Sequence, residues 1–370
     1  MDKDQLSNIA KKLVAPKKGI LAADESNPTI ANRFDSIGVE SNENNRRNYR
    51  DMLFSTKTVN EYISGVILYE ETLYQKNLKG EMLSSLLQSK DIIPGIKVDK
   101  STKDFIGFPG EKITEGLDGL FERMKKYYED GARFSKWRAV ITIGDQIPSA
   151  QCIEFNSILL ARYAIASQEA GLVPIVEPEV LMDGNHDIDT CNKVTSATLD
   201  EVFKQLNQQN VYLPGILLKP NMILSGKDSI NRADKNIVAK MTIDCLKKHV
   251  PIEVPGIIFL SGGQSDSESI ENLDSINKLA KDKKPPWELS FSYGRGLQTS
   301  TLKKWSGQTK YIKDAQEEFI NRCKQVSLAT IFRIIICFTN LMDILIATRN
   351  KGKIAEISRF FQKKKLKFMT

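Results

Sequence analysis

The chain has 370 residues, of which 41% are hydrophobic and 27% are charged, and its formal net charge at pH 7 is +7. A chain of this length and apolar content is long enough for one (β/α)8 barrel with extensions. The positive charge does not indicate a nucleic-acid-binding face, because residues 329–370 hold nine Lys or Arg and two acidic residues, which accounts for all of it.

Cysteine and histidine usage narrows the classes further. Five cysteines are scattered without CxxC spacing, and no secretory signal opens the chain, so we expect a reduced, cytoplasmic compartment without disulfides. His186 and His249 are too few for a catalytic zinc site built mainly on imidazole. We therefore expect no metal and no cofactor, with the chemistry carried by lysines and carboxylates.

Short apolar runs of strand length recur along the chain, and most intervals between them are polar, amphipathic and long enough for a crossover helix, such as 115–130 and 157–170. In chain order the runs are GILAAD from Gly19, SGVILYE from Ser64, PGIKVD from Pro94, RFSKWRAVITIG from Arg133, LVPIVEPE from Leu172, PGILLK from Pro214, GIIFLSGG from Gly256 and ELSFSYGR from Glu288. Eight such alternations predict an α/β fold, a (β/α)8 TIM barrel that forms a single domain over residues 1–330. The alternative is an open doubly wound sheet, but no GxGxxG follows the first run to support a dinucleotide site.

Charged and small polar residues gather where these runs end. Such residues are Asp24 and Glu25 in the first run, Lys97 and Asp99 in the third, Lys136 and Arg138 in the fourth, Glu177 and Glu179 in the fifth, Lys219 in the sixth, Ser261, Gly262 and Gly263 in the seventh, and Ser292, Gly294 and Arg295 in the eighth. The carboxyl ends of barrel strands meet at one mouth, and residues two apart on a strand share a face. The sequence therefore predicts several cations and carboxylates in one cavity.

The last two run ends, SGG and YGR, offer unobstructed backbone N–H groups where barrels commonly bind phosphate. Lys219, directly before Pro220, is open to two interpretations: a solvated strand end, or an amine held in an apolar pocket as a nucleophile. With a phosphate cradle nearby, the second interpretation indicates a sugar phosphate whose carbonyl forms an iminium with Lys219. Lys136 would favour the neutral amine by like-charge repulsion, and Glu177 could move protons during dehydration of the carbinolamine.

Seven blocks, GILAADES, GIKVDK, FSKWR, VPIVEPE, LLKPNM, FLSGGQS and FSYGR, resemble in order and spacing the class I fructose-bisphosphate aldolases, over residues from about 5 to 330. The resemblance implies a (β/α)8 barrel, usually a homotetramer, of glycolysis and gluconeogenesis. It further implies metal-free, reversible cleavage of fructose 1,6-bisphosphate into dihydroxyacetone phosphate and glyceraldehyde 3-phosphate.

The resemblance also implies the roles of individual residues. Lys219 would be the Schiff-base lysine, Glu177 the proton acceptor and donor, and Asp24 a carboxylate that assists cleavage of the C3–C4 bond. Lys136 would tune that chemistry, and Glu179 is the second candidate for proton transfer. Substrate contacts are expected from Ser261, Gly262, Gly263, Ser292, Gly294 and Arg295 at one phosphate, and from Ser26, Arg33, Lys97 and Arg138 at the other end, with Arg46 in NNRRNYR as a further basic position.

The chain departs from the family pattern at two places. Asn27-Pro28 stands where the family usually has a less constrained pair, and Pro28 fixes its own φ and removes a backbone donor close to a phosphate end. After NRCKQVSLAT the family normally continues into a flexible tail that closes on a tyrosine, whereas no tyrosine follows Tyr311 here. The alternative function is therefore a sugar-phosphate-binding barrel with low turnover; a transaldolase-like Schiff-base enzyme is the alternative activity.

Residues 331–370 form an atypical tail. MDILIATRNKGKIAEISRFF from Met342 resembles the amino-terminal strand and phosphate loop of the inosine-triphosphate pyrophosphatase family, and a frameshift or read-through near Thr330 is the simplest origin for it. So short a piece cannot bury a core of its own. A membrane helix over 328–348 would contain Arg333 and Asp343, and KKKLK could bind acidic lipid, but we expect neither a membrane nor a nucleic-acid partner.

Overall fold

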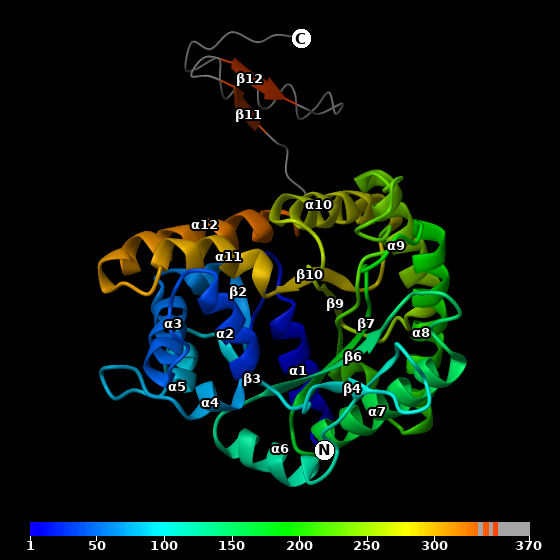
Figure 1. The fold of residues 1–370 in the computed structure, drawn as a ribbon, viewed down its shortest axis with the longest axis horizontal. Helices are drawn as coiled ribbons and strands as arrows, with labels where there is room; N and C mark the ends of the chain where they lie inside the picture. The colour runs from blue at the N-terminus through cyan, green and yellow to red at the C-terminus, as the bar shows by residue number, and fades with distance from the viewer. Residues whose placement is uncertain (332–335, 340–342, 347–370) are drawn as a thin grey trace. The chain divides into compact units, whose positions relative to one another are not determined.

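Residues 1–331, 336–339 and 343–346 are described by the computed structural model, and the chain divides into two units, Met1–Ile331 and Phe332–Thr370 (Figure 1). The first unit is a closed barrel of parallel strands in the order β1-β10-β9-β8-β7-β6-β3-β2. Its strands are β1 (Gly19–Ala23), β2 (Ile63–Leu68), β3 (Ile93–Lys97), β6 (Phe134–Ile141), β7 (Val173–Val180), β8 (Leu217–Leu218), β9 (Gly256–Phe259) and β10 (Glu288–Tyr293). Each strand lies within or overlaps one of the eight predicted runs, so the predicted barrel is confirmed.

Helices surround this barrel (Figure 1). They are α1 (Lys3–Leu13), α2 (Asn27–Asp35), α3 (Glu43–Ser55), α4 (Glu70–Tyr74), α5 (Leu83–Ser89), α6 (Leu120–Glu129), α7 (Ala150–Glu169), α8 (Ile188–Gln208), α9 (Lys235–His249), α10 (Asp266–Lys283), α11 (Arg295–Trp305) and α12 (Ile312–Leu328), with 3-10 turns η1 (Val59–Glu61), η2 (Leu213–Gly215) and η3 (Thr309–Tyr311). Helix α6 begins later than predicted because Gly119 precedes it at φ 62°, and α7 begins earlier because Ser149 caps it. A two-stranded antiparallel sheet, β4 (Thr102–Asp104) with β5 (Lys112–Thr114), is inserted between β3 and β6.

Helix α1, which the sequence did not predict, packs its apolar face against the amino-terminal ends of the strands. Leu6, Ala10 and Leu13 share one buried cluster with inward residues of the barrel. The contact is close enough to require glycine on the strands, because a Cβ on Gly65 would lie 2.6 Å from the Leu13 side chain. Since this end is covered, the open end of the barrel is the carboxyl end.

Strand periodicity separates an apolar layer of the barrel interior from a charged one. Phe134 on β6 and Ile175 on β7 belong to the buried cluster that contacts α1. One step of two residues further along each strand come Lys136 and Glu177, which are also buried. The same spacing that builds the lower core therefore brings charged side chains together above it.

In the second unit, β11 (Ile336–Thr339) pairs with β12 (Asp343–Ile346) as an antiparallel pair, with Phe338 opposite Ile344. The membrane helix considered over 328–348 is wrong for these residues, because the apolar residues on both sides of Asp343 are in strands. Over the described ranges, no helix is long and apolar enough to cross a bilayer. The predicted phosphate loop after Ile346 and the KKKLK cluster lie outside the described residues.

Candidate active site

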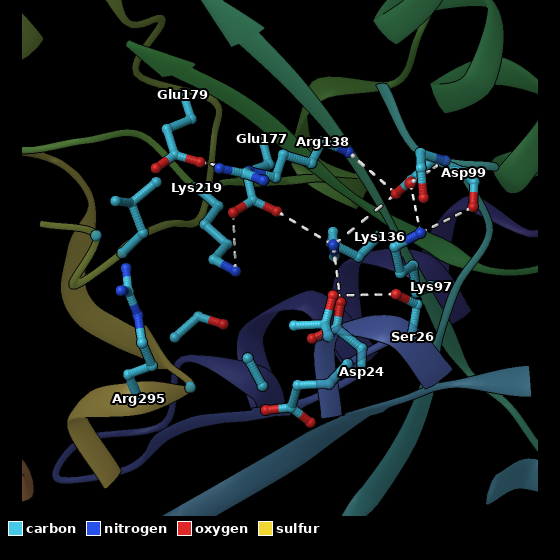
Figure 2. A pocket seen from close by; sticks show the side chains of 18 of the residues that line it. Asp24, Ser26, Lys97, Asp99, Lys136, Arg138, Glu177, Glu179, Lys219 and Arg295 are labelled. Atoms are coloured by element: carbon cyan, nitrogen blue, oxygen red, sulfur yellow. Dashed lines mark hydrogen bonds and ion pairs between the residues drawn. The ribbon is translucent and has the colours of Figure 1, made fainter. Parts of the chain in front are cut away.

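A cavity of about 640 Å³ opens at the carboxyl end of the barrel. Strand register brings its charged side chains to one level, since Lys97 on β3 is paired with Lys136 on β6, and Arg138 on β6 is paired with Glu177 on β7. Lys219 directly follows β8, where its N–H donates to the Val176 carbonyl at 2.8 Å. Lysines and carboxylates from distant parts of the chain therefore face one space (Figure 2).

Lys219 and Lys136 lie on either side of Glu177, and all three residues are at most 4% exposed. Lys219 Nζ is 3.0 Å from Glu177 Oε1, and Lys136 Nζ is 3.6 Å from Glu177 Oε2 (Figure 2). Lys136 is closer still to Asp24, at 2.8 Å from Oδ2. Buried charges persist only when they are paired, so this arrangement fixes each group relative to the others.

Asp99 extends the cluster toward β3. Its carboxylate lies 2.5 Å from Lys97 Nζ and 3.9 Å from Lys136 Nζ. It also accepts hydrogen bonds from the backbone N–H groups of Ser101 at 3.1 Å and Arg138 at 3.4 Å. With it, the cluster holds three ammonium groups against three carboxylates, and a proton can move between partners without changing the net charge.

Lys136 and Asp24, which form an ion pair in this cluster, hold each other ionised. Burial alone would raise the pKa of Asp24, but Lys136 and then Lys219 outweigh it and hold that pKa well below its usual range. Burial alone would likewise lower the pKa of Lys136, but Asp24, Glu177 and Asp99 raise it above its usual value. Asp24 is therefore available as a proton acceptor and Lys136 as a fixed positive charge.

The opposite wall of the cavity is suited to an anion. Helix α11 begins at Arg295 with Gly294 as its N-cap, so unpaired N–H groups and the positive end of the helix dipole lie there. Ser261, Gly262 and Ser292 line the same cavity, and Ser292 Oγ is buried with no hydrogen-bond partner among the described residues. Arg33 reaches this wall too, because its Nη2 lies 3.9 Å from the position that a Gly294 Cβ would occupy.

Glu179 is held between Arg138, which donates to its carboxylate, and the backbone of Gly262. A Cβ on Gly262 would lie 2.7 Å from Glu179 Oε1, a contact that real side chains do not make. The absence of a side chain at Gly262 therefore lets the carboxylate and the β9 loop occupy adjacent positions.

Replacing Gly262 with alanine should move the Glu179 carboxylate away from Arg138 and lower kcat/KM by about tenfold, because even a small misplacement of an active-site group slows the reaction. Steady-state kinetics with the sugar phosphate that the sequence predicts as substrate checks this. Gly80→Ala is the control, since Gly80 has φ 83° and an open surrounding, so it should lose some stability only. An unchanged kcat/KM in Gly262→Ala would show that the position of Glu179 does not matter.

Most of the predicted site residues line this cavity. They are Asp24, Ser26, Arg33, Lys97, Lys136, Arg138, Glu177, Glu179, Lys219, Ser261, Gly262, Ser292, Gly294 and Arg295. Arg46 and Gly263 are not among the lining residues: Arg46 pairs with Glu71 at 2.5 Å, and Gly263 has φ 71° in the adjoining turn. Glu25 and Asp99, which the sequence places at strand ends without a role of their own, line the cavity too. So do Thr29, Asn32, Ser101 and Thr102, which no feature of the sequence marks.

The departure at Asn27-Pro28 fits the local backbone. Ser26 is the N-cap of α2 and lines the cavity, and Pro28 falls in the first turn of that helix. A proline is tolerated there because the missing N–H would have no partner within the helix. Pro28 therefore costs the helix no hydrogen bond.

Comparison with known proteins gives one consistent family. The family model described as "Glycolytic: Fructose-bisphosphate aldolase class-I" matches residues 5–335. The probable fructose-bisphosphate aldolase class 1 of Xanthomonas axonopodis pv. citri is 51% identical over 332 residues, covering 90% of this chain and 98% of that protein. Cytosolic fructose-bisphosphate aldolase 4 of Arabidopsis thaliana is 52% identical over 316 residues, covering 85% of this chain and 80% of that protein.

A solved structure agrees. Fructose-bisphosphate aldolase from Plasmodium falciparum, in a ternary complex with TRAP and a small-molecule inhibitor, superposes with a TM-score of 0.87 at 48% identity. The match covers 89% of this chain and 94% of that one. At this identity the likeness concerns the family as well as the fold.

Proposed function

The chain belongs to the class I fructose-bisphosphate aldolases, and we propose that Lys219 is the amine that forms the Schiff base with the ketone of fructose 1,6-bisphosphate. The observation that carries this assignment is the 3.0 Å contact between buried Lys219 Nζ and Glu177 Oε1. Transfer of a proton from Lys219 to Glu177 gives a neutral amine and a carboxylic acid. The neutral amine of Lys219 attacks carbon 2 of the substrate. The carboxylic acid of Glu177 is then in place to protonate the hydroxyl group that leaves.

Dehydration of the carbinolamine follows from the same pair. Glu177 gives its proton to the departing hydroxyl, water leaves, and the nitrogen of Lys219 becomes a positively charged iminium. Lys136, 3.6 Å from the other Glu177 oxygen, stabilises the carboxylate that results. The proton that Lys219 gave to Glu177 therefore leaves with the water molecule, and Glu177 is again a carboxylate.

Cleavage of the C3–C4 bond requires a base at the C4 hydroxyl, and we assign that role to Asp24. Its lowered pKa, which Lys136 maintains against burial, keeps it ionised at neutral pH. As it takes the hydroxyl proton, the C3–C4 electron pair moves into the iminium. Glyceraldehyde 3-phosphate leaves, and an enamine of dihydroxyacetone phosphate remains on Lys219.

The phosphates are assigned by charge and by the shape of the walls. Ser261, Gly262, Gly294 and Arg295 would hold one phosphate at the start of α11, with the unpartnered Ser292 hydroxyl beside them. The family resemblance implies a place for Arg33 at the other end of the substrate, but its Nη2 lies 3.9 Å from the position of a Gly294 Cβ, so we assign it to this wall instead. Lys97, Arg138 and Ser26 would contact the other end of the substrate, where Lys97 is balanced by Asp99.

Borohydride reduction in the presence of fructose 1,6-bisphosphate tests the Schiff base. Peptide mapping should find the reduced adduct on Lys219. Lys90 is an internal control: burial lowers its pKa, but Nζ donates to the carbonyls of Phe54 and Thr56 away from the cavity, so it should stay unmodified. Cleavage that disappears with EDTA would contradict the metal-independent chemistry proposed here.

We also propose that the protein is a cytosolic homotetramer. Relatives at about 50% identity are named cytosolic or cytoplasmic aldolases, and the family resemblance implies four subunits. Light scattering coupled to gel filtration measures the mass directly. A monomeric mass at working concentration would contradict the oligomer without affecting the activity.

For the second unit, we propose that residues 332–370 do not complete the active site and that their origin is a frameshift or read-through. The family match ends at 335, residues 1–331 are a compact unit, and the sequence offers no tyrosine after Tyr311 to protonate the enamine. Carbon–carbon cleavage should then be intact, while release of dihydroxyacetone phosphate limits turnover.

Deletion of residues 332–370 should leave kcat within about twofold of the parent value, whereas a flexible tail ending in tyrosine should raise it by about tenfold or more, as proton transfer typically does. Steady-state kinetics and single-turnover cleavage on the same preparations separate the two steps. Deletion that abolishes cleavage in a protein that circular dichroism shows to be folded would make these residues part of the catalyst.

A further inference from the structure

Two arginines share one buried carboxylate beneath the anion-binding wall. Glu25, which follows Asp24 at the end of β1, accepts from Arg33 Nη1 through Oε1 and from Arg50 Nη2 through Oε2, the latter at 2.6 Å. Gln298 on α11 donates to the same Oε1 at 3.0 Å. Glu25 and Arg33 line the substrate cavity, and Arg50, on α3, is 3% exposed and does not.

This group is not balanced in charge. In the described part of the chain, Glu25 is the one carboxylate within ion-pair distance of either arginine, so two guanidinium groups face a single negative charge. Arg50 Nη1 is buried and has no hydrogen-bond partner there. A buried cation that shares its counter-ion with a second cation is costly and is expected where its charge is used.

The geometry points to Arg50 as a remote determinant of phosphate affinity. We propose that Arg50 takes up half of the negative charge of Glu25, so that Arg33 keeps a positive field toward the substrate phosphate beside Gly294. If Arg33 alone faced Glu25, the pair would be neutral, and the wall would lose most of the contribution of Arg33. The buried surroundings weaken screening, so a charge that does not touch the substrate can still act on it.

This inference rests on the proposed role of Arg33 at the phosphate. It predicts that removing a cation of this group raises KM, whereas removing its carboxylate does not. Arg50→Met should raise the KM for fructose 1,6-bisphosphate by about tenfold, with kcat within about threefold, because it removes a charge that acts on bound substrate and transition state alike. Arg50→Lys should recover part of the loss. Glu25→Gln should not raise KM, because it removes the neutralising charge. The double variant Glu25→Gln/Arg50→Met, with the same net charge as the parent, should lie close to it.

A purely structural brace would give another pattern: both single variants would raise KM, and the double variant would be the worst. The competitive inhibition constant of inorganic phosphate provides a binding readout that is independent of turnover, and it should follow KM. Rates are normalised to sites that borohydride can trap with substrate. Arg133→Met, which removes a half-buried arginine that donates to the carbonyls of Tyr128 and Ala132, is the matched control and should leave KM unchanged.

The outcomes are distinguishable. If Arg33→Met does not raise KM, the proposed phosphate role of Arg33 fails. If Arg33→Met raises KM but Arg50→Met equals the parent, the inference about Arg50 is overturned and the proposed function stands. If Glu25→Gln is unstable, Arg50→Met and Arg50→Lys still test the inference through the inhibition constant of inorganic phosphate. Arg50→Lys restores the charge but not the packing of Arg50, so a packing defect would remain in it.

Discussion

Replacing Lys219 with arginine should abolish cleavage of fructose 1,6-bisphosphate, with a loss of at least about 10⁴-fold in kcat, as for other residues that act as covalent nucleophiles. Guanidinium stays protonated at any accessible pH, so no neutral amine is available to attack the carbonyl. The positive charge beside Glu177 is kept, and phosphate binding at the opposite wall should survive in part. Steady-state kinetics measures the loss of cleavage, and intact mass after borohydride reduction measures the loss of the adduct. Calorimetry measures the substrate binding that remains.

This prediction discriminates between two uses of the same cavity. A sugar-phosphate-binding barrel with little turnover would also lose the adduct in Lys219→Arg, but its parent would show near-normal binding with very slow cleavage. Measuring binding and steady-state cleavage on one parent preparation therefore has to accompany the variant. An adduct that persists in Lys219→Arg would move the nucleophile to another lysine of the cluster, with Lys136 the first to examine because it shares Glu177.

The fold was readable from the sequence because a parallel barrel buries both faces of its strands. The strands are then short, largely apolar runs, such as Ile20 to Ala23 in β1, and eight of them can be counted along the chain. Helix α1 was not predicted, although Leu6, Ala10 and Leu13 recur at the i, i+4, i+7 spacing of an amphipathic helix. What could not be read from the sequence is its position under the barrel, because that depends on contacts with strands far along the chain.

The site was readable in part for a similar reason. Strand ends converge in a barrel, so the positions of Lys136, Glu177 and Lys219 in the sequence are enough to indicate one cavity. Pairing could not be read, because it depends on side-chain distances between strands. Arg46 and Arg50 lie one turn apart on α3, yet Arg46 pairs with Glu71, outside the cavity lining, and Arg50 pairs with Glu25, which is part of that lining.

Glu177→Gln should lower kcat by about 10²–10⁴-fold while leaving substrate affinity within about tenfold, which is the range expected for loss of a general acid–base group. Glutamine keeps the size of the side chain but can neither accept the proton of Lys219 nor return it to the carbinolamine hydroxyl. Lys136 would also lose one of its three carboxylate neighbours and keep Asp24 at 2.8 Å, so the positioning of Asp24 should persist.

The step that slows identifies the role of Glu177. Iminium formation, followed by the fraction of enzyme that borohydride traps at early times, should lag behind substrate binding in Glu177→Gln, whereas cleavage from preformed iminium should be nearly unaffected. Glu179→Gln is the matched comparison, because Glu179 is bound by Arg138 and has no ion pair with Lys219 in the described residues. If Glu177→Gln were indistinguishable from the parent and Glu179→Gln were slow, proton transfer would belong to Glu179, and the 3.0 Å contact with Lys219 would serve only to hold the lysine in place.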